Sequence, residues 1–263
     1  MSISPEASVE QDGVPEQRRA DERSVAERVR RDLAMVRTAS ERLADEVSRL
    51  DDRAMREPSG LPGWSRAHVV SHLARNADAL VNLITWARTG VEHPMYASTA
   101  DRDADIEEGA GRLAQVLHED LGAARDRLMT AAIALSGAQW LASVTARGNM
   151  VIPASRIPEM RLFEIWVHLV DLGTGFTFAD VPADHLERLL GVAVAKHIDR
   201  PDGPSVRLTV ELPGGGDHRW DLVGGTGGVH EVTGGPAEVI AWLAGRSEGA
   251  DLRGDVPRLP AWG

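Results

Sequence analysis

Four stretches of the chain repeat apolar residues every three or four positions, the spacing that places side chains along one face of an α-helix. They lie at about residues 24–51, 66–88, 105–135 and 159–172. The stretch at 66–88 follows a loop rich in Pro and Gly and begins after Ser65, a residue type favoured at helix N-termini. Four long amphipathic helices predict an up-down four-helix bundle.

A different pattern separates and follows these helices. Residues 143–158 alternate apolar and polar side chains and contain two prolines, which predicts a β-like excursion or an extended loop. After about Pro182 come one helix at about 184–198, three short alternating runs between glycine-rich turns, and a last helix at 236–246. These runs predict a small α/β unit with a mostly antiparallel sheet.

The predicted organisation therefore has three parts and belongs to the α+β class. Residues 1–22 are polar, with Pro, Gly, Gln and mixed charge, and are predicted to be a disordered tail. Residues 23–180 would form the bundle and residues 181–263 the α/β unit, with the boundary near 178–183.

Composition narrows the possible functions. Apolar residues make up 43% and charged residues 26%, which is ordinary for a globular protein, and the formal net charge is −11. A negative field repels phosphate backbones and anionic lipids, so neither nucleic acid nor a membrane surface is an expected partner. An anionic small-molecule substrate would need arginines close to it. The N-terminal residues lack the apolar segment of a signal peptide, so the cytoplasm is the expected location.

The chain has no cysteine. Disulfides, thiolate metal ligands and a cysteine nucleophile are therefore all excluded. A bound metal would be held by histidines and carboxylates, and any thiol chemistry would need a thiol supplied from outside.

Two helices carry potential metal ligands one turn apart. His68 and His72 lie on the second helix, and Glu164 and His168 lie on the fourth. Spacing of i, i+4 places both side chains of a pair on one helix face. A catalytic zinc site uses three protein ligands and leaves room for water or substrate. Glu164 and His168 would supply two ligands from an apolar segment, where burial of an unpaired carboxylate is costly. The competing interpretations are that Glu164 and His168 form a surface pair and that His72 is an ordinary, partly buried histidine.

Several motifs together resemble one family. The segments GWSRAHVVSHLARNADAL, HPMYAS, VIPAS, MRLFEIWVHLVDLG and AGR…GDVPRLPAWG follow one another in an order and spacing similar to those of the mycothiol-dependent maleylpyruvate isomerase family. The resemblance covers nearly everything after the tail. It implies an N-terminal four-helix bundle of the DinB type.

The resemblance also implies site residues. His72 rather than His68, together with Glu164 and His168, is expected to bind a divalent metal, namely zinc. Arg102 looks like the family's catalytic arginine, and Arg246 like an arginine that the C-terminal domain contributes to the same cleft. For either arginine, a solvated surface charge is the alternative.

The implied reaction uses mycothiol as a thiol cosubstrate. Its thiolate adds to the cis double bond of maleylpyruvate, the resulting single bond rotates, and expulsion of the thiolate leaves fumarylpyruvate. A mycothiol S-transferase and a non-catalytic metal-binding module remain alternatives, and the chain is expected to be a monomer or a homodimer.

The resemblance leaves the thiol pocket open. Trp86, Trp166 and Asn76 are candidate walls, although core packing is the better expectation for both tryptophans. Asp171 would orient a ligand histidine or lie at the surface.

Overall fold

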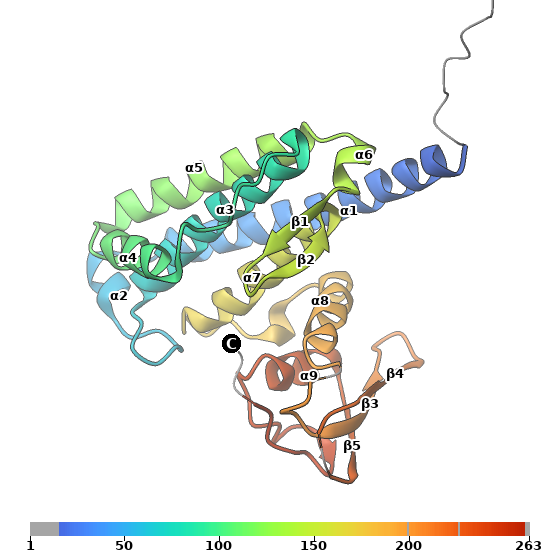
Figure 1. Ribbon diagram of the computed structural model, residues 1–263. Coiled ribbons are helices and arrows are strands. Elements are labelled where there is room, and N and C mark those ends of the chain that lie inside the picture. The colour runs from blue at the N-terminus through green and yellow to red at the C-terminus, as the bar shows by residue number, and fades with distance from the viewer. Residues whose placement is uncertain (1–15, 199, 226, 261–263) are drawn as a thin grey trace, which may run out of the picture.

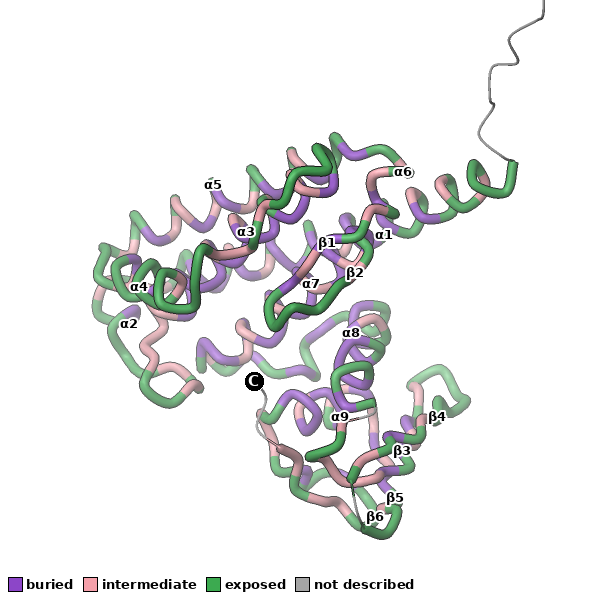
Figure 2. The backbone as a smooth tube through the Cα atoms, viewed as in Figure 1, coloured by how far each residue is buried: buried purple, intermediate pink, exposed green. Residues whose placement is uncertain are grey.

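The computed structural model describes residues 16–198, 200–225 and 227–260, and its N-terminal part is a helical bundle (Figure 1). Its four long helices are α1 (Glu16–Val47), α3 (Arg66–Thr89), α5 (Ala114–Ile133) and α7 (Ile157–Asp171). Helix α1 packs against α5 and α7, and α3 packs against the same two helices. The bundle predicted from the four amphipathic stretches is confirmed, and the purple, buried sides of its helices face one another in Figure 2.

Short elements connect the long helices. They are α2 (Asp52–Arg56), α4 (Thr99–Ala110), α6 (Gly137–Trp140) and the 3-10 turn η1 (Ala154–Arg156). Between α6 and η1, strands β1 (Ser143–Ala146) and β2 (Met150–Pro153) form an antiparallel hairpin. This hairpin confirms the β-like excursion that the alternating pattern predicted.

Two helix boundaries differ from the prediction. Helix α1 begins at Glu16, so residues 16–22 are helical rather than part of a disordered tail; residues 1–15 lie outside the described residues. Polar composition hid this extension because the first turns of α1 are largely exposed and need few apolar positions. At its other end α1 stops at Val47, a few residues earlier than predicted.

The third predicted helix, 105–135, is in fact two helices, and the first begins earlier, at Thr99 behind the N-cap Ser98. Gly109, near the end of α4, packs so closely on α3 that a Cβ there would lie 2.1 Å from the Ser71 Oγ. Asp52 then caps the new helix, because its Oδ1 accepts a hydrogen bond of 2.7 Å from the Ala114 N–H. Both contacts join residues that are distant in the sequence, so the hydrophobic periodicity of the segment does not predict the break between α4 and α5.

The C-terminal part is a small mixed sheet with two helices. After η2 (Phe178–Asp180) come α8 (Ala183–Ala195), β3 (Ser205–Glu211), β4 (Asp217–Leu222), β5 (Val229–Gly234), α9 (Pro236–Leu243) and β6 (Arg253–Gly254). The strand order is β4-β3-β5-β6, in which β3 and β5 are parallel and the other two pairs antiparallel. The mostly antiparallel sheet and the α+β class are confirmed.

Helix α8 joins the two parts. It packs against α7 on one side and α9 on the other, so the C-terminal part lies against the α7 side of the bundle (Figure 1). The buried residues form one continuous hydrophobic cluster that runs from α1 to Leu252. The predicted domain boundary near 178–183 stays a prediction. Within the described residues no helix is long and apolar enough to cross a bilayer.

Candidate metal centre

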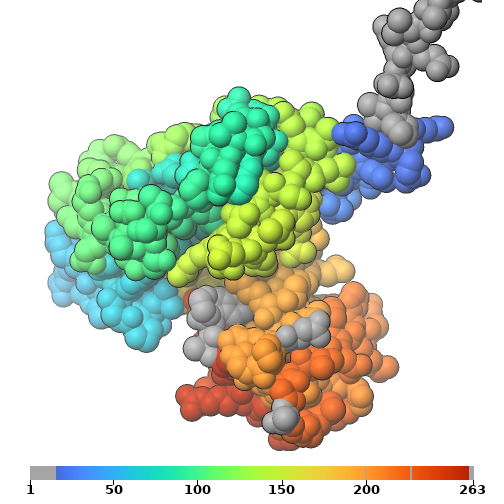
Figure 3. Space-filling model, viewed as in Figure 1, coloured from blue at the N-terminus to red at the C-terminus, as the bar shows by residue number. Residues whose placement is uncertain are grey.

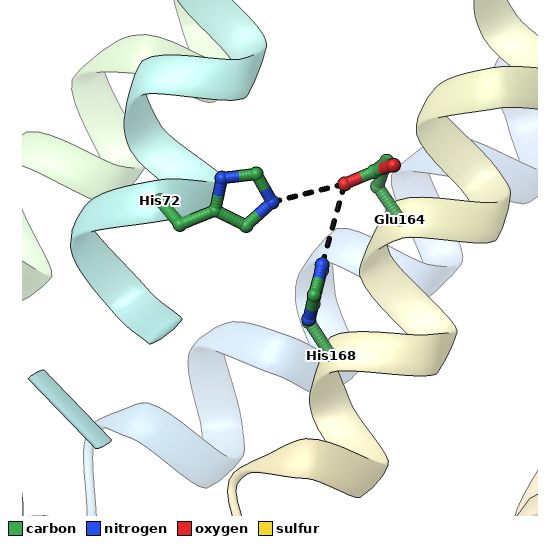
Figure 4. Close-up of side chains that lie close together, drawn as sticks. All are labelled: His72, Glu164 and His168. Carbon is green, nitrogen blue, oxygen red and sulfur yellow. Dashed lines mark hydrogen bonds and ion pairs between the residues drawn. The ribbon is translucent and has the colours of Figure 1, made fainter. Parts of the chain in front are cut away.

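Helices α3 and α7 bring three of the predicted ligands together. His72 lies on α3, and Glu164 and His168 lie one turn apart on α7, with their side chains pointing toward His72 (Figure 4). Their ligand atoms all lie within 4.8 Å of one another. Among the described residues this is the one group of three or more His, Asp or Glu side chains arranged closely enough to share a metal ion.

One carboxylate oxygen is the centre of this group. Oε2 of Glu164 lies 3.0 Å from Nε2 of His72 and 3.4 Å from Nε2 of His168. Donor atoms around a tetrahedral zinc ion are about 3.3 Å apart, given zinc–nitrogen distances of about 2.0–2.1 Å. Two imidazole nitrogens and one carboxylate oxygen are also the donor types of catalytic zinc sites, so the group fits such an ion.

Burial sets the protonation state of His72, and hydrogen bonds set that of Glu164. Burial lowers the pKa of His72 from 6.5 to about 4, against the opposing hydrogen bond to Glu164. Burial acts to raise the pKa of Glu164, but hydrogen bonds from His168 and His72 hold it well below its usual value. At neutral pH His72 is therefore neutral and Glu164 is ionised, the states in which both groups bind metals.

His168 is held from behind by Asp171. The His168 Nδ1 and the Asp171 Oδ2 are 2.8 Å apart, which places a proton on Nδ1 and directs Nε2 toward Glu164. Burial acts to lower the pKa of His168, but the hydrogen bonds to Asp171 and Glu164 outweigh it and raise the pKa. Asp171 is only 2% exposed, so it is a buried orienting group and not a surface aspartate.

The two predicted arginines lie in different places. Arg102, on α4, has its Nη2 3.4 Å from Nδ1 of His72 and its guanidinium 5.9 Å from the Tyr96 ring centroid. Arg246 lies behind His168, where it pairs with Asp171, and it does not line the cavity beside the metal group. That Arg246 contributes to the cleft stays a prediction; in this structure Asp171 engages its guanidinium.

His68 is outside the group. Its Nδ1 lies 2.7 Å from the Ser65 hydroxyl at the start of α3, and its Nε2 lies 3.0 Å from Glu107. His68 completes a capping box at the helix N-terminus. The preference for His72 over His68 in the histidine position agrees with this geometry.

A cavity of about 620 Å³ opens beside the group, between the bundle, the β1–β2 hairpin and the end of α8. Figure 3 shows the hairpin in yellow-green on the surface between the bundle and the orange C-terminal part. Apolar side chains form much of the cavity wall; they include Leu80, Met95, Met160, Phe163 and Val192. Cationic side chains line it too, and these are Arg102, Arg147, Arg156, Lys196 and Arg200. The cavity thus suits an anionic ligand with an apolar body.

Sequence reasoning missed several of these residues. Tyr96 lines the cavity, and burial raises the pKa of its hydroxyl. Tyr96 lies in the HPMYAS segment, one of the motifs that resemble the family, and this is the feature of the sequence that could have identified it. Arg147 and Lys196 gave no signal, because a hairpin tip and a helix end meet only in the folded chain. Of the candidate walls, Asn76 lines this cavity, Trp86 lines a smaller neighbouring cavity, and Trp166 is a core residue stacked on Phe176.

Comparisons with known proteins show which family this chain resembles. The family model of the mycothiol maleylpyruvate isomerase N-terminal domain matches residues 36–173. The crystal structure of a mycothiol-dependent maleylpyruvate isomerase is 30% identical in sequence, with a TM-score of 0.80, and the match covers 89% of this chain and 97% of that one. A histidine-to-alanine mutant of such an enzyme matches with the same identity and coverage and a TM-score of 0.79. No curated protein matches this chain by sequence.

The family match spans more than half of the chain, and it contains the helices that carry His72, Glu164 and His168. The structural matches extend the likeness to the C-terminal part. The chain therefore belongs to the mycothiol-dependent maleylpyruvate isomerase family.

Proposed function

We propose that this chain is a zinc-dependent isomerase that uses mycothiol to convert maleylpyruvate into fumarylpyruvate. The observation that carries the proposal is the group His72, Glu164 and His168, which fits one metal ion and opens onto a cavity with cationic side chains. The family membership supplies the thiol and the substrate class.

In this proposal the three side chains are the metal ligands. A divalent cation held by them would favour the anionic form of a thiol that enters the cavity, because the metal is the largest local charge. The chain itself has no thiol that would compete for this position. His72 and Glu164 need not lose a proton at neutral pH before binding, since burial and mutual hydrogen bonds already set their ligand forms.

Arg102 is proposed to bind the substrate. Addition of a thiolate to the cis double bond moves negative charge onto the oxygen atoms of the keto acid. The Arg102 guanidinium lies against His72 at the edge of the cavity, where it would bind a substrate carboxylate and stabilise that charge. Its Nη1 already pairs with the exposed Asp103 at 2.6 Å, so a substrate would meet a guanidinium that is held in place.

Arg246 is proposed to act at a distance from the substrate. It is the counter-ion of Asp171, and Asp171 in turn holds the Nδ1–H of His168. We assign Arg246 the role of a positioning residue, which keeps Asp171 ionised and thereby fixes the ring of His168.

One assay tests the proposed function. Purified, zinc-loaded protein is mixed with mycothiol and maleylpyruvate, and the product isomer and the free thiol are both quantified, with controls that omit each component. The proposal expects fumarylpyruvate to form while the thiol concentration stays constant. Stoichiometric loss of thiol would instead indicate an S-transferase, and absence of any reaction at full zinc occupancy would overturn the enzymatic proposal.

A further inference from the structure

Arg161 is a buried cation to which the described residues offer no ionic partner. It is 2% exposed and lies on α7 one turn before Glu164. Within the described part of the chain no carboxylate forms an ion pair with it. Burial lowers its pKa to about 10, so the guanidinium stays charged at neutral pH. Burying a charged guanidinium costs desolvation free energy, so the groups that it contacts indicate its role.

Those partners are two oxygen atoms of α3. Nη1 of Arg161 donates to the Leu73 carbonyl and to Oδ1 of Asn76, both at 2.8 Å. A guanidinium is a donor only, so the amide of Asn76 must turn its oxygen toward Arg161. The Asn76 Nδ2 is then directed away from Arg161.

The Asn76 amide nitrogen has no acceptor within the described residues. Asn76 is 6% exposed and lies one turn after His72 on the same helix face, where it lines the 620 Å³ cavity together with His72 and Glu164. An N–H donor on a buried side chain that lines a cavity and has no protein acceptor fits a ligand oxygen. The charge on Arg161 also polarises the amide, which strengthens its N–H groups as donors.

We propose that Asn76, oriented by Arg161, donates a hydrogen bond from Nδ2 to an oxygen of the anionic electrophile. Asn76 would then be a substrate-binding residue in the cavity wall, and Arg161 a positioning residue that acts through it. This inference rests on the proposed function for the identity of the electrophile, but the contact itself depends only on an anionic oxygen.

Asn76→Asp is the central variant for the test. An aspartate keeps the size of the side chain and its acceptor for Arg161, but it has no N–H to donate. Because Arg161 gains a counter-ion, the melting temperature should be equal to or above that of the wild type. Asn76→Ala removes the donor without adding a negative charge, and Gln115→Ala, which truncates an exposed amide on α5, is the matched control.

Binding is measured first, without turnover. Maleate, a cis-dicarboxylate, is titrated calorimetrically into zinc-loaded protein in the absence of thiol. We expect the Kd for maleate to rise at least tenfold in both Asn76 variants and to be unchanged in Gln115→Ala, with one zinc retained per chain. In the isomerase assay kcat should fall about 100-fold, the usual effect of losing one donor to a developing oxyanion.

Arg161→Met tests the positioning role. Without its cation the Asn76 amide is free to rotate, so kcat should fall as in Asn76→Ala while zinc content is unchanged. In an Asn76→Ala background Arg161→Met should then lower kcat no further. A purely structural role of Arg161 predicts the same loss in both backgrounds and would contradict this assignment.

The outcomes separate the two proposals. Asn76-dependent maleate binding without isomerisation would support the contact and overturn the proposed function. Isomerisation and maleate binding at wild-type levels in Asn76→Asp would overturn the contact and leave the proposed function standing. A wild-type protein that does not bind maleate at all would also overturn the contact.

Discussion

Arg246 and Asp171, 75 residues apart in the sequence, form a two-point ion pair in which Nε and Nη2 lie 3.0 and 2.7 Å from Oδ1 and Oδ2. The same Oδ2 lies 2.8 Å from Nδ1 of His168. A residue of the C-terminal part is thus linked through Asp171 to His168, one of the three candidate metal ligands.

This relationship predicts the effect of removing the carboxylate charge. Asp171→Asn should weaken zinc binding about 10–100-fold, as loss of such an orienting partner typically does. Competition against a fluorescent chelator measures the affinity. Asp180→Asn, which changes an exposed aspartate that caps η2, should leave the affinity unchanged. Equal affinities in Asp171→Asn and the wild type would refute the orienting role.

The metal group predicts a sharp contrast between two histidines of one helix. His72→Ala should reduce bound zinc from one ion per chain to none and lower kcat/KM more than 100-fold, since two ligands rarely hold a catalytic zinc. His68→Ala should keep the zinc, because His68 bonds to Ser65 and Glu107 instead. Metal analysis after gel filtration compares the two. Full zinc occupancy in His72→Ala would refute the ligand assignment.

Removal of the metal should destabilise the folded chain. At a free zinc concentration of about 100 times the Kd, binding to the native state alone contributes about 2.7 kcal/mol. For a chain of this size, EDTA should therefore lower the Tm by about 5–10 °C. Differential scanning fluorimetry with and without EDTA tests this, and re-addition of zinc should restore the Tm. An identical Tm in both conditions would contradict a structural link between the metal and α3 and α7.

Arg102 should be needed for catalysis but not for metal binding. Arg102→Gln removes the cation beside His72, so kcat/KM should fall about 100-fold or more while zinc content stays at one ion per chain. Arg112→Gln, near the end of the same region and paired with exposed Glu108, should leave kcat/KM within about twofold. Steady-state kinetics at saturating mycothiol distinguish the two variants.

A buried histidine predicts part of the acid sensitivity of the fold. Nδ1 of His185 accepts a hydrogen bond of 3.0 Å from the Trp166 indole, and burial lowers the pKa of His185 below 6.5. The unfolded chain therefore binds this proton more readily than the folded one. Its contribution to stability is complete above pH 6.5 and is lost as the pH falls below that value. Thermal melts of the metal-free protein between pH 7.5 and about 5 should show a smaller decrease in Tm for His185→Gln than for the wild type.

The sequence predicted the elements of the bundle well because each long helix buries one regular apolar stripe. It failed where the cause is a contact between distant residues. The break between α4 and α5 depends on Gly109 lying against Ser71 and on Asp52 capping α5 at Ala114. Neither contact changes the spacing of apolar residues along the sequence. The early start of α1 was missed for the opposite reason, since an exposed helix needs no apolar stripe.

For the site, spacing alone found the pair Glu164 and His168, because i, i+4 residues share a helix face whatever the fold. The choice of His72 over His68 needed the family resemblance. The family resemblance pointed to Arg246, but nothing in the sequence indicated that the buried Asp171 engages its guanidinium. The orientation of the Asn76 amide depends on Arg161, 85 residues away, and is visible only in three dimensions.

The ion pair between Arg246 and Asp171 also limits how the bundle can be used by itself. The family model matches only residues 36–173, which invites excision of that segment as a minimal carrier of the candidate metal site for grafting or design. Such a fragment would leave the Asp171 carboxylate without its counter-ion next to the histidine that it orients. A designer who wants the isolated helices would have to supply a replacement cation at the end of α7.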